Sequence, residues 1–289
     1  GAGAVSFSGN SDLLILSDIL LPTGVAVSLT PAGELDIQAS VSGSPSRLDV
    51  SSGSVIRLWS SSFSASLSAG SAPVSLRAPK LEVGRSYYEP GFVDGGTVTI
   101  QADEVEMAGL SQVQASGTGT ALQVSGQSGN TAHFVLESGG SPQLSTPNGR
   151  WLVWATDYLD STHFSASSLF HDFRQHDASF GTATVLGAGN GLLFSVAPRL
   201  NVTGALTTKP SKVYDGTTDL AGLGTGLGLV PEIAGDSVSA TTPFSGVRFA
   251  KADAGTNISL VATIGGPLPE VRDSASRPVY GYRFDGSGP

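Results

Sequence analysis

Short apolar–polar–apolar triplets recur along the first half of the chain, and two of the segments that carry them align without gaps. Residues 74–83 (VSLRAPKLEV) lie over residues 98–107 (VTIQADEVEM) at an offset of 24 residues. In each triplet the first and third positions are apolar and the middle one is polar, which is the alternation of a half-buried β-strand. Triplets at 27–29 and 35–37 fit the same pattern with one inserted residue. A repeat of about 20–25 residues built from short strands predicts a parallel β-helix over residues 1–148.

Residues 62–69 (SFSASLSA) alternate strictly between serine and an apolar residue. Phe63, Ala65, Leu67 and Ala69 would share one face of a strand, and the serines would share the other. The serine face has two interpretations, a glycan-binding ladder or the solvated side of a half-buried strand. Strand periodicity alone favours the second.

Aromatic residues become dense from Gly149 onwards. They lie in the segments 149–157 (GRWLVWATD), 170–181 (FHDFRQHDASFG) and 191–198 (GLLFSVAP). The last coil of a β-helix has open strand edges and an exposed end of the core, which must be covered. We therefore expect residues 149–204 to form a cap and linker. The side chains suited to cover the open end are those of Trp151, Trp154, Phe170, Phe173 and Phe180.

The composition supports an all-β chain. Its 289 residues include 38 Gly and 16 Pro, and only 13% are charged, so the residues that cover helix surfaces are scarce. Short apolar alternations punctuated by Gly and Pro are instead typical of β-structure. No signal peptide is visible at Gly1, and we expect a fragment of a longer protein.

Charge and cysteine usage exclude several classes of function. The formal net charge of −9 argues against nucleic-acid binding, because no basic patch replaces the phosphate counterions. No run of about 18 apolar residues is present to span a bilayer. Without cysteine, zinc–thiolate sites, iron–sulfur clusters, thiol catalysis and disulfides are excluded.

Two clusters of titratable residues are candidates for chemistry. His171 and His176, flanked by aspartates, could be drawn as a metal or haem site, although zinc ligands usually show tighter spacing; polar residues on a cap loop are the simpler interpretation. Asp103, Glu104 and Glu106 could serve a polysaccharide-cleaving enzyme, but strand alternation places both glutamates on an outward face, where solvation explains them. We therefore expect no catalytic residues, no metal and no cofactor.

The loop 187–191 (GAGNG) is only superficially like a phosphate-binding loop. It lacks the G-x-G-x-x-G spacing and the helix that follows it in nucleotide-binding folds. We assign it no ligand.

The segment 212–218 (KVYDGTT) predicts a strand end followed by a turn. The Asp215 side chain can cap the turn, and Gly216 tolerates a positive φ before the β-branched pair Thr217 and Thr218. Tyr214 would pack inward at the strand end. Two alternating strands should then flank the turn at 253–257.

This heptad resembles the opening of the YDG repeat, a small β-domain of very long secreted bacterial adhesins. Further matches follow in the family's order at 235–238 (GDSV), Phe244 and 252–257 (ADAGTN). Residues 149–198 in turn resemble the stretch that precedes YDG repeats in haemagglutinin-type exoproteins of two-partner secretion. Trp154 stands there in place of a tyrosine, and residues 176–177 (HD) replace the family's Tyr-Asn.

The resemblance implies a filamentous haemagglutinin-type exoprotein of all-β architecture. A right-handed parallel β-helix over 1–148 would be followed by the aromatic cap over 149–204 and a small β-sandwich or β-grasp-like YDG domain over 205–289. It also implies a non-enzymatic adhesin or biofilm-matrix component, secreted or attached to the Gram-negative cell surface. Implied partners are an outer-membrane secretion protein and a host glycan, matrix protein or biofilm polysaccharide.

Two other functions stay open. Some exoproteins of this secretion type capture haem carriers or other nutrients, and some β-helix proteins degrade polysaccharides. Binding to haemoproteins would distinguish the first, and release of reducing ends from glycans would distinguish the second.

Overall fold

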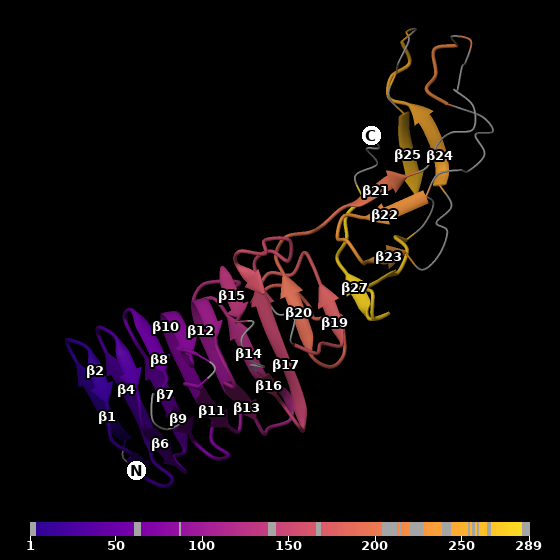
Figure 1. Cartoon of the computed structure of the whole chain (residues 1–289). Helices are drawn as coiled ribbons and strands as arrows, with labels where there is room; N and C mark the ends of the chain where they lie inside the picture. The colour runs from indigo at the N-terminus through magenta and orange to yellow at the C-terminus, as the bar shows by residue number, and fades with distance from the viewer. Residues whose placement is uncertain are drawn as a thin grey trace. The chain divides into compact units, whose positions relative to one another are not determined.

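All regular structure in the described part of the chain is β-structure (Figure 1). The computed structural model describes residues 4–60, 65–86, 88–137, 143–165, 169–203, 213, 215–219, 228–238, 244–253, 255, 258, 260–264 and 267–284. The chain divides into two compact units, residues 1–196 and residues 197–289.

The first unit is built from three rows of parallel strands, and one pass of the chain through the rows forms a coil. The first row contains β1 (Ala4–Gly9), β4 (Ala26–Pro31), β7 (Arg47–Ser51), β10 (Val74–Val83), β12 (Val98–Met107), β14 (Gly119–Ser125), β17 (Gly149–Ala155) and β20 (Gly191–Phe194). The second row contains β2 (Leu13–Ile15), β5 (Leu35–Ile37), β8 (Val55–Leu58), the later halves of β10 and β12, β15 (His133–Leu136) and β18 (Phe164–Ser165). The third row contains β3 (Ile19–Leu21), β6 (Ser40–Gly43), β9 (Ala65–Ser68), β11 (Gly91–Gly95), β13 (Gln112–Ala115) and β16 (Gln143–Ser145).

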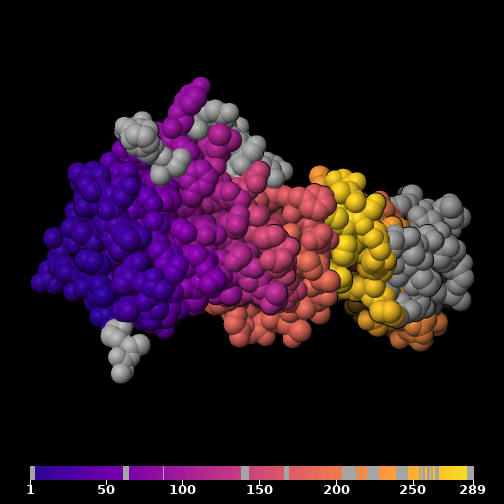
Figure 2. Space-filling view, turned by 90° about the horizontal axis from the view of Figure 1, so that it is seen from below, coloured from indigo at the N-terminus to yellow at the C-terminus, as the bar shows by residue number. Residues whose placement is uncertain are grey.

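The coils follow one another in sequence order. Figure 2 shows this as successive bands of colour across the first unit, from indigo to red. Residues that occupy corresponding positions in successive coils therefore lie side by side, although many residues separate them in the sequence.

The register of the strands confirms the alignment read from the sequence. Val74 lies beside Val98 and Val83 beside Met107, without a gap between β10 and β12. The earlier triplets fit as predicted, since Val27 is in register with Leu48 of β7, which is itself in register with Val74. The inserted residue falls in the turn between β4 and β5, outside the strands.

The core of the first unit is a stack of aliphatic side chains. Alternation turns every second residue of a strand inward. Parallel register then places each inward side chain beside the corresponding inward side chain of the next coil. One such column is fully buried and consists of Val27, Leu48, Val74, Val98 and Leu122. Each side chain contributes about 1.5–3 kcal/mol by its removal from water.

The rows continue beyond residue 148. β17 pairs with β14 and β20 pairs with β17, so residues 149–194 extend the first row. Trp151 is in register with Leu122 and belongs to the buried stack. The first unit thus holds both the expected stem and much of the expected cap.

The second unit consists of antiparallel pairs. β21 (Leu200–Thr203) pairs with β22 (Gly228–Pro231), and β26 (Val271–Arg272) pairs with both β23 (Ser237–Val238) and β27 (Pro278–Tyr280). β24 (Phe244–Phe249) and β25 (Leu260–Ile264) are also paired, which confirms the two strands predicted around residues 253–257. Among the described residues of the second unit, the buried apolar ones are Leu200, Ile233, Val271, Val279 and Tyr282.

Candidate functional site

The outer face of the second row carries a series of ion pairs that crosses from coil to coil. We call it the charge ladder; it consists of Glu34, Arg57, Glu82, Lys80, Glu106 and His133. Parallel register produces it, because Arg57 lies beside Glu82 and Glu82 lies beside Glu106 in successive coils. An outward charge in one coil therefore meets the outward charge of the next.

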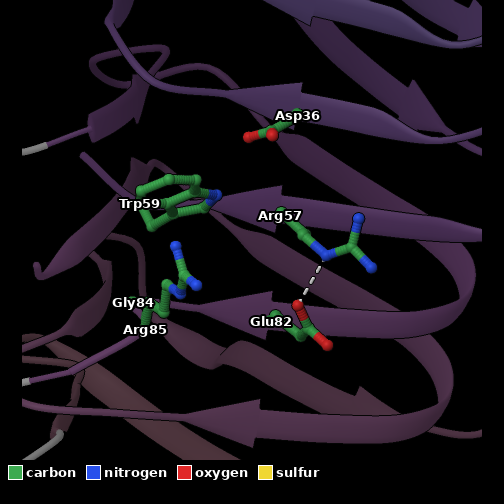
Figure 3. Close-up of a pocket in the computed structure, with 6 residues that line it drawn as sticks. All are labelled: Asp36, Arg57, Trp59, Glu82, Gly84 and Arg85. Carbon is green, nitrogen blue, oxygen red and sulfur yellow. Dashed lines mark hydrogen bonds and ion pairs between the residues drawn. The ribbon is translucent and has the colours of Figure 1, made fainter. Parts of the chain in front are cut away.

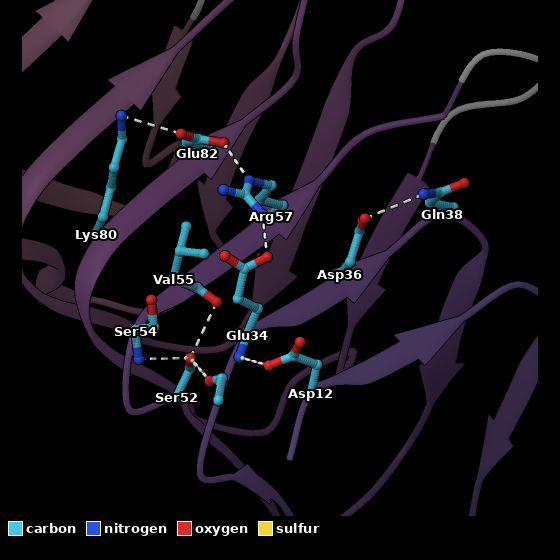
Figure 4. A network of polar contacts seen from close by, with 11 residues as sticks. Asp12, Glu34, Asp36, Gln38, Ser52, Ser54, Val55, Arg57, Lys80 and Glu82 are labelled. Carbon is cyan, nitrogen blue, oxygen red and sulfur yellow. Dashed lines mark hydrogen bonds and ion pairs between the residues drawn. The ribbon is translucent and has the colours of Figure 1, made fainter.

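Arg57 bridges two coils at the start of the ladder (Figure 4). Its Nη1 lies 2.5 Å from Glu34 Oε2, and its Nε lies 2.7 Å from Glu82 Oε2. Burial lowers the pKa of the Arg57 guanidinium, but its hydrogen bonds to Glu82 and Glu34 outweigh burial, and the pKa is raised.

Lys80 continues the ladder between two glutamates. Its Nζ lies 3.0 Å from Glu82 Oε1 and 3.0 Å from Glu106 Oε2, and Glu106 Oε1 lies 3.2 Å from His133 Nε2. Burial lowers the pKa of Lys80, but the hydrogen bonds to Glu106 and Glu82 outweigh burial, and the pKa is raised. For Glu82, burial raises the pKa and the bonds from Lys80 and Arg57 lower it, with a net lowering.

Of the carboxylates singled out from the sequence, Glu106 belongs to this ladder and Glu104 lies beside it. Glu104 and Glu106 lie on the outward face of β12 on either side of buried Val105, and Lys80 Nζ is 3.9 Å from Glu104 Oε2. Asp103 instead accepts a hydrogen bond from the backbone N–H of Gln127, at 3.0 Å. The expectation that solvation alone explains the glutamates misses these cross-coil ion pairs.

A pocket of about 290 Å³ opens beside the charge ladder (Figure 3). Its lining comes from three successive coils and consists of Asp36, Arg57, Trp59, Glu82, Gly84 and Arg85. It combines an aromatic ring with hydrogen-bonding groups of both charges, which is the composition of a site for a polar ligand with an apolar face.

Trp59 is the aromatic wall of the pocket. The Arg85 guanidinium carbon lies 4.8 Å from the indole centroid, a cation–π contact that holds the ring in place. Asp36 and Arg85 lie on opposite sides of the indole in Figure 3. Asp36 Oδ2 accepts a hydrogen bond from Gln38 at 3.1 Å, whereas buried Oδ1 has no partner among the described residues.

None of the pocket residues was singled out from the sequence. Asp36, Arg57 and Glu82 are neighbours in register, but the turns between them differ in length, so no fixed spacing marks them. To find them, the sequence would have had to reveal the strand alternation of all three coils, including the coil of β7 and β8, which was not predicted.

The aromatic residues expected to cover the open end have different environments. Trp151 is 2% exposed inside the stack. Trp154 is on the outward side of β17, 5.6 Å from the ring of Phe180 and at an interplanar angle of 73°. Phe173 is fully buried, but Phe170 is 76% exposed, so the expected covering role does not extend to Phe170.

The loop 187–191 explains the burial of Phe173. A β-carbon on Gly187 or Gly191 would lie 2.1 Å from a ring atom of Phe173, so the ring packs between the two glycines. Asn190 fixes the loop, since its Oδ1 accepts a hydrogen bond from the Trp151 N–H at 2.9 Å. These glycines make room for an aromatic ring.

The two histidines of the candidate metal site are buried side chains of this region. His176 is 2% exposed, and its ring stacks on Phe194 at 5.2 Å between centroids. Burial and the nearby Arg174 charge lower the pKa of His176 to about 3, so the imidazole is neutral at physiological pH. No group of three or more His, Cys, Asp or Glu side chains suited to a metal occurs within the described residues.

The serine strand has one fully buried face. Ala65, Leu67 and Ala69 are 0% exposed, as the half-buried interpretation predicts; Phe63 lies outside the described residues. Ser66 Oγ bonds to Ser40 Oγ at 3.0 Å, and Ser68 Oγ bonds to Asp94 Oδ2 at 3.1 Å. The outward serines therefore bond to the neighbouring coils.

In the heptad of the second unit, Asp215 caps the turn. Its Oδ1 accepts hydrogen bonds of 2.9 Å from both the N–H and the hydroxyl of Thr217. Gly216 has a φ of 78°, the left-handed conformation that the sequence predicts. The Thr218 carbonyl accepts a hydrogen bond from the Phe249 N–H at 2.9 Å, which ties the turn to β24. Tyr214 lies outside the described residues.

Comparison with known proteins identifies one domain. Residues 197–267 match the YDG domain family, so a YDG domain is found in the second unit. No curated protein and no solved structure matches the chain. Among the described residues, no helix has the length and apolar character needed to cross a membrane.

Proposed function

We propose that the first unit is a right-handed parallel β-helix that serves as the stem of an adhesin or biofilm-matrix protein. Three rows of parallel strands in sequence order support this fold. Right-handedness follows from the strong preference of parallel crossover connections for that hand. The second unit, with its YDG domain, would follow the stem as part of the same surface protein.

The charge ladder is the observation that carries the stem proposal. A stem must resist separation of its coils. The backbone hydrogen bonds of the parallel rows oppose separation, and the side-chain ion pairs add contacts that run in the same direction. In the interior, the columns of buried aliphatic side chains also join successive coils and oppose their separation.

A non-enzymatic role fits the state of the carboxylates. Glu82 and Glu106 both form ion pairs with Lys80, and the lowered pKa of Glu82 holds that residue ionised. A general acid for glycoside cleavage needs a raised pKa. The haem-carrier alternative has no observation in its favour among the described residues.

The proposed protein is secreted or displayed at the Gram-negative cell surface by a two-partner system of the filamentous haemagglutinin type. The motive for this proposal is the sequence resemblance of residues 149–198 to the stretch that precedes YDG repeats in such exoproteins. The secretion partner would be an outer-membrane protein, and the target a host glycan, matrix protein or biofilm polysaccharide.

The test is a binding screen with beads that carry the 289-residue chain. We expect retention on at least one of three surfaces: a host glycan array, immobilised matrix proteins, or purified biofilm polysaccharide. Beads with heat-unfolded chain are the control. Absence of retention on all three surfaces contradicts the adhesin proposal, and release of reducing ends from a bound glycan contradicts its non-enzymatic character.

A further inference from the structure

We infer that the pocket around Trp59 binds a neutral hexose unit of a polysaccharide chain. The inference rests on the proposed function and names the ligand class and the site.

The volume suits one or two sugar rings. At about 290 Å³ the pocket is just below the range of about 300–1,000 Å³ for small-molecule sites. Gly84 contributes to this space, because it forms part of the lining without a side chain. An open pocket on an outward face lets the rest of a polysaccharide extend beyond it.

The indole provides the surface against which a sugar ring packs. The apolar face of a pyranose carries C–H groups that lie against an aromatic ring. Trp59 is only half-buried, and Arg85 stacks on it. Since Arg85 belongs to the coil that follows and Asp36 to the coil that precedes, a ring bound on the Asp36 side leaves the Arg85 contact intact.

Asp36 supplies the polar anchor. Its Oδ1 has no partner among the described residues, whereas Oδ2 keeps the bond from Gln38. A buried carboxylate oxygen without a donor is costly, and the hydroxyl of a ligand that reaches Oδ1 would satisfy it while Oδ2 keeps the bond from Gln38.

The charges favour a neutral sugar over an acidic one. The lining contains two carboxylates and two guanidinium groups, and Glu82 already pairs with Arg57. Arg57 is shared with a third carboxylate, that of Glu34. The carboxylate of a uronic acid bound on the Asp36 side would meet the charge of Asp36, whereas Arg57 is already paired and Arg85 lies on the other side of the indole.

Tryptophan fluorescence provides a direct readout. The chain has three tryptophans, and the other two, Trp151 and Trp154, are only 2% and 4% exposed. A sugar that packs against Trp59 should therefore change the emission through that residue. The probes are the neutral hexamers cellohexaose, maltohexaose and mannohexaose, with hexagalacturonate as the acidic comparison.

We expect at least one neutral hexamer to shift the emission of the full chain and hexagalacturonate to leave it unchanged. Calorimetry measures the affinity of the variants, and Trp59→Ala should weaken binding by about tenfold or more. Trp59→Phe keeps an aromatic wall and should retain most of it, and Asp36→Asn should weaken it several-fold. Tyr88→Ala is the matched control, because Tyr88 is 85% exposed and outside the pocket lining.

Three results would overturn the inference: no response to any neutral hexamer, unchanged affinity in Trp59→Ala with an unaltered melting curve, or stronger binding of hexagalacturonate. Should Trp59→Ala fail to fold, loss of affinity in Asp36→Asn but not in Tyr88→Ala decides the matter in its place. If beads with the Trp59→Ala chain are retained in the surface screen as well as beads with the unaltered chain, this pocket is refuted but the adhesin proposal is kept. If the hexamers bind through Trp59 but the chain adheres to no surface, the adhesin proposal is refuted and the pocket is kept.

Discussion

The ring of Phe173 occupies the space into which a side chain at Gly191 would project. A β-carbon there would lie 2.1 Å from Cζ of the ring, far closer than packed carbon atoms approach. Gly187 stands in the same relation to the other end of the ring. The two glycines and the phenylalanine therefore form one packing unit.

Gly191→Ala should lower the free energy of unfolding of the first unit by about 1–3 kcal/mol, because an added methyl group overpacks a filled core. Thermal or chemical unfolding of the variant measures the loss. Gly129→Ala is the matched control, since no atom lies within 4 Å of its would-be β-carbon. In the double variant with Phe173→Leu the extra cost of Gly191→Ala should shrink; equal costs with and without Phe173 contradict the packing unit.

Lys80→Met should destabilise the first unit by about 1 kcal/mol, because it leaves Glu82 and Glu106 without their shared cation. The loss should be smaller in high salt, which screens the ion pairs. Arg47→Met is the comparison, since Arg47 is 62% exposed and has one ion pair, with Asp49. Urea unfolding at low and high salt measures the loss of unfolding free energy in both variants. If the two losses are equal, an ion pair within the ladder stabilises the protein no more than an isolated ion pair does.

His176 should make the first unit less stable in mild acid. Its pKa falls from 6.5 to about 3 on folding, chiefly through burial. Between these values the unfolded chain binds a proton that the folded chain does not, so stability is full above about pH 6.5 and falls as the pH drops towards 3. The slope for this one group reaches about 1.4 kcal/mol per pH unit.

The measurement is the melting temperature at several pH values between 7.5 and 4.5. His176→Phe keeps an aromatic ring beside Phe194 and should flatten the dependence. His163→Gln is the control, since that side chain is 56% exposed. An unchanged slope in His176→Phe would place the acid sensitivity elsewhere.

Gly216→Val should lower the stability of the second unit by about 1–2 kcal/mol, because a β-branched residue is strained at a φ of 78°. No atom of the described residues lies within 4 Å of the would-be β-carbon, so the expected cost is that of the backbone conformation. Gly216→Asn should cost clearly less, since asparagine tolerates left-handed backbone. If both variants cost the same, the turn is not held in this conformation in solution.

The sequence was most informative where the spacing of the coils is regular. Val74 and Val98 begin strands of equal length, 10 residues each, so a gapless alignment predicts their register in space. The strands β7 and β8 were missed because their coil has different turn lengths on either side. The third row was largely missed as well, because its strands are short and alternate over only a few residues.

The candidate site was harder to predict because it is made by contacts between coils. Arg57 and Glu82 have no distinctive spacing, and only their register brings them together. The loop 187–191 shows the opposite difficulty, since its glycines are conspicuous but serve packing around Phe173. In the second unit, by contrast, the turn at Gly216 follows from local conformational preference alone, and the sequence predicts it directly.

The inserted residue between β4 and β5 shows where this chain tolerates changes of length. It lies in a turn, and β7 and β8 carry the same extra residue; β10 lacks it, yet Leu48 meets Val74 and Ile56 meets Leu81 in register. The same insertion within β5 would turn Leu35 or Ile37 towards water and expose the core to a polar side chain. Over generations, deletions and insertions should therefore accumulate at the corners of the coils, while the strands keep their length.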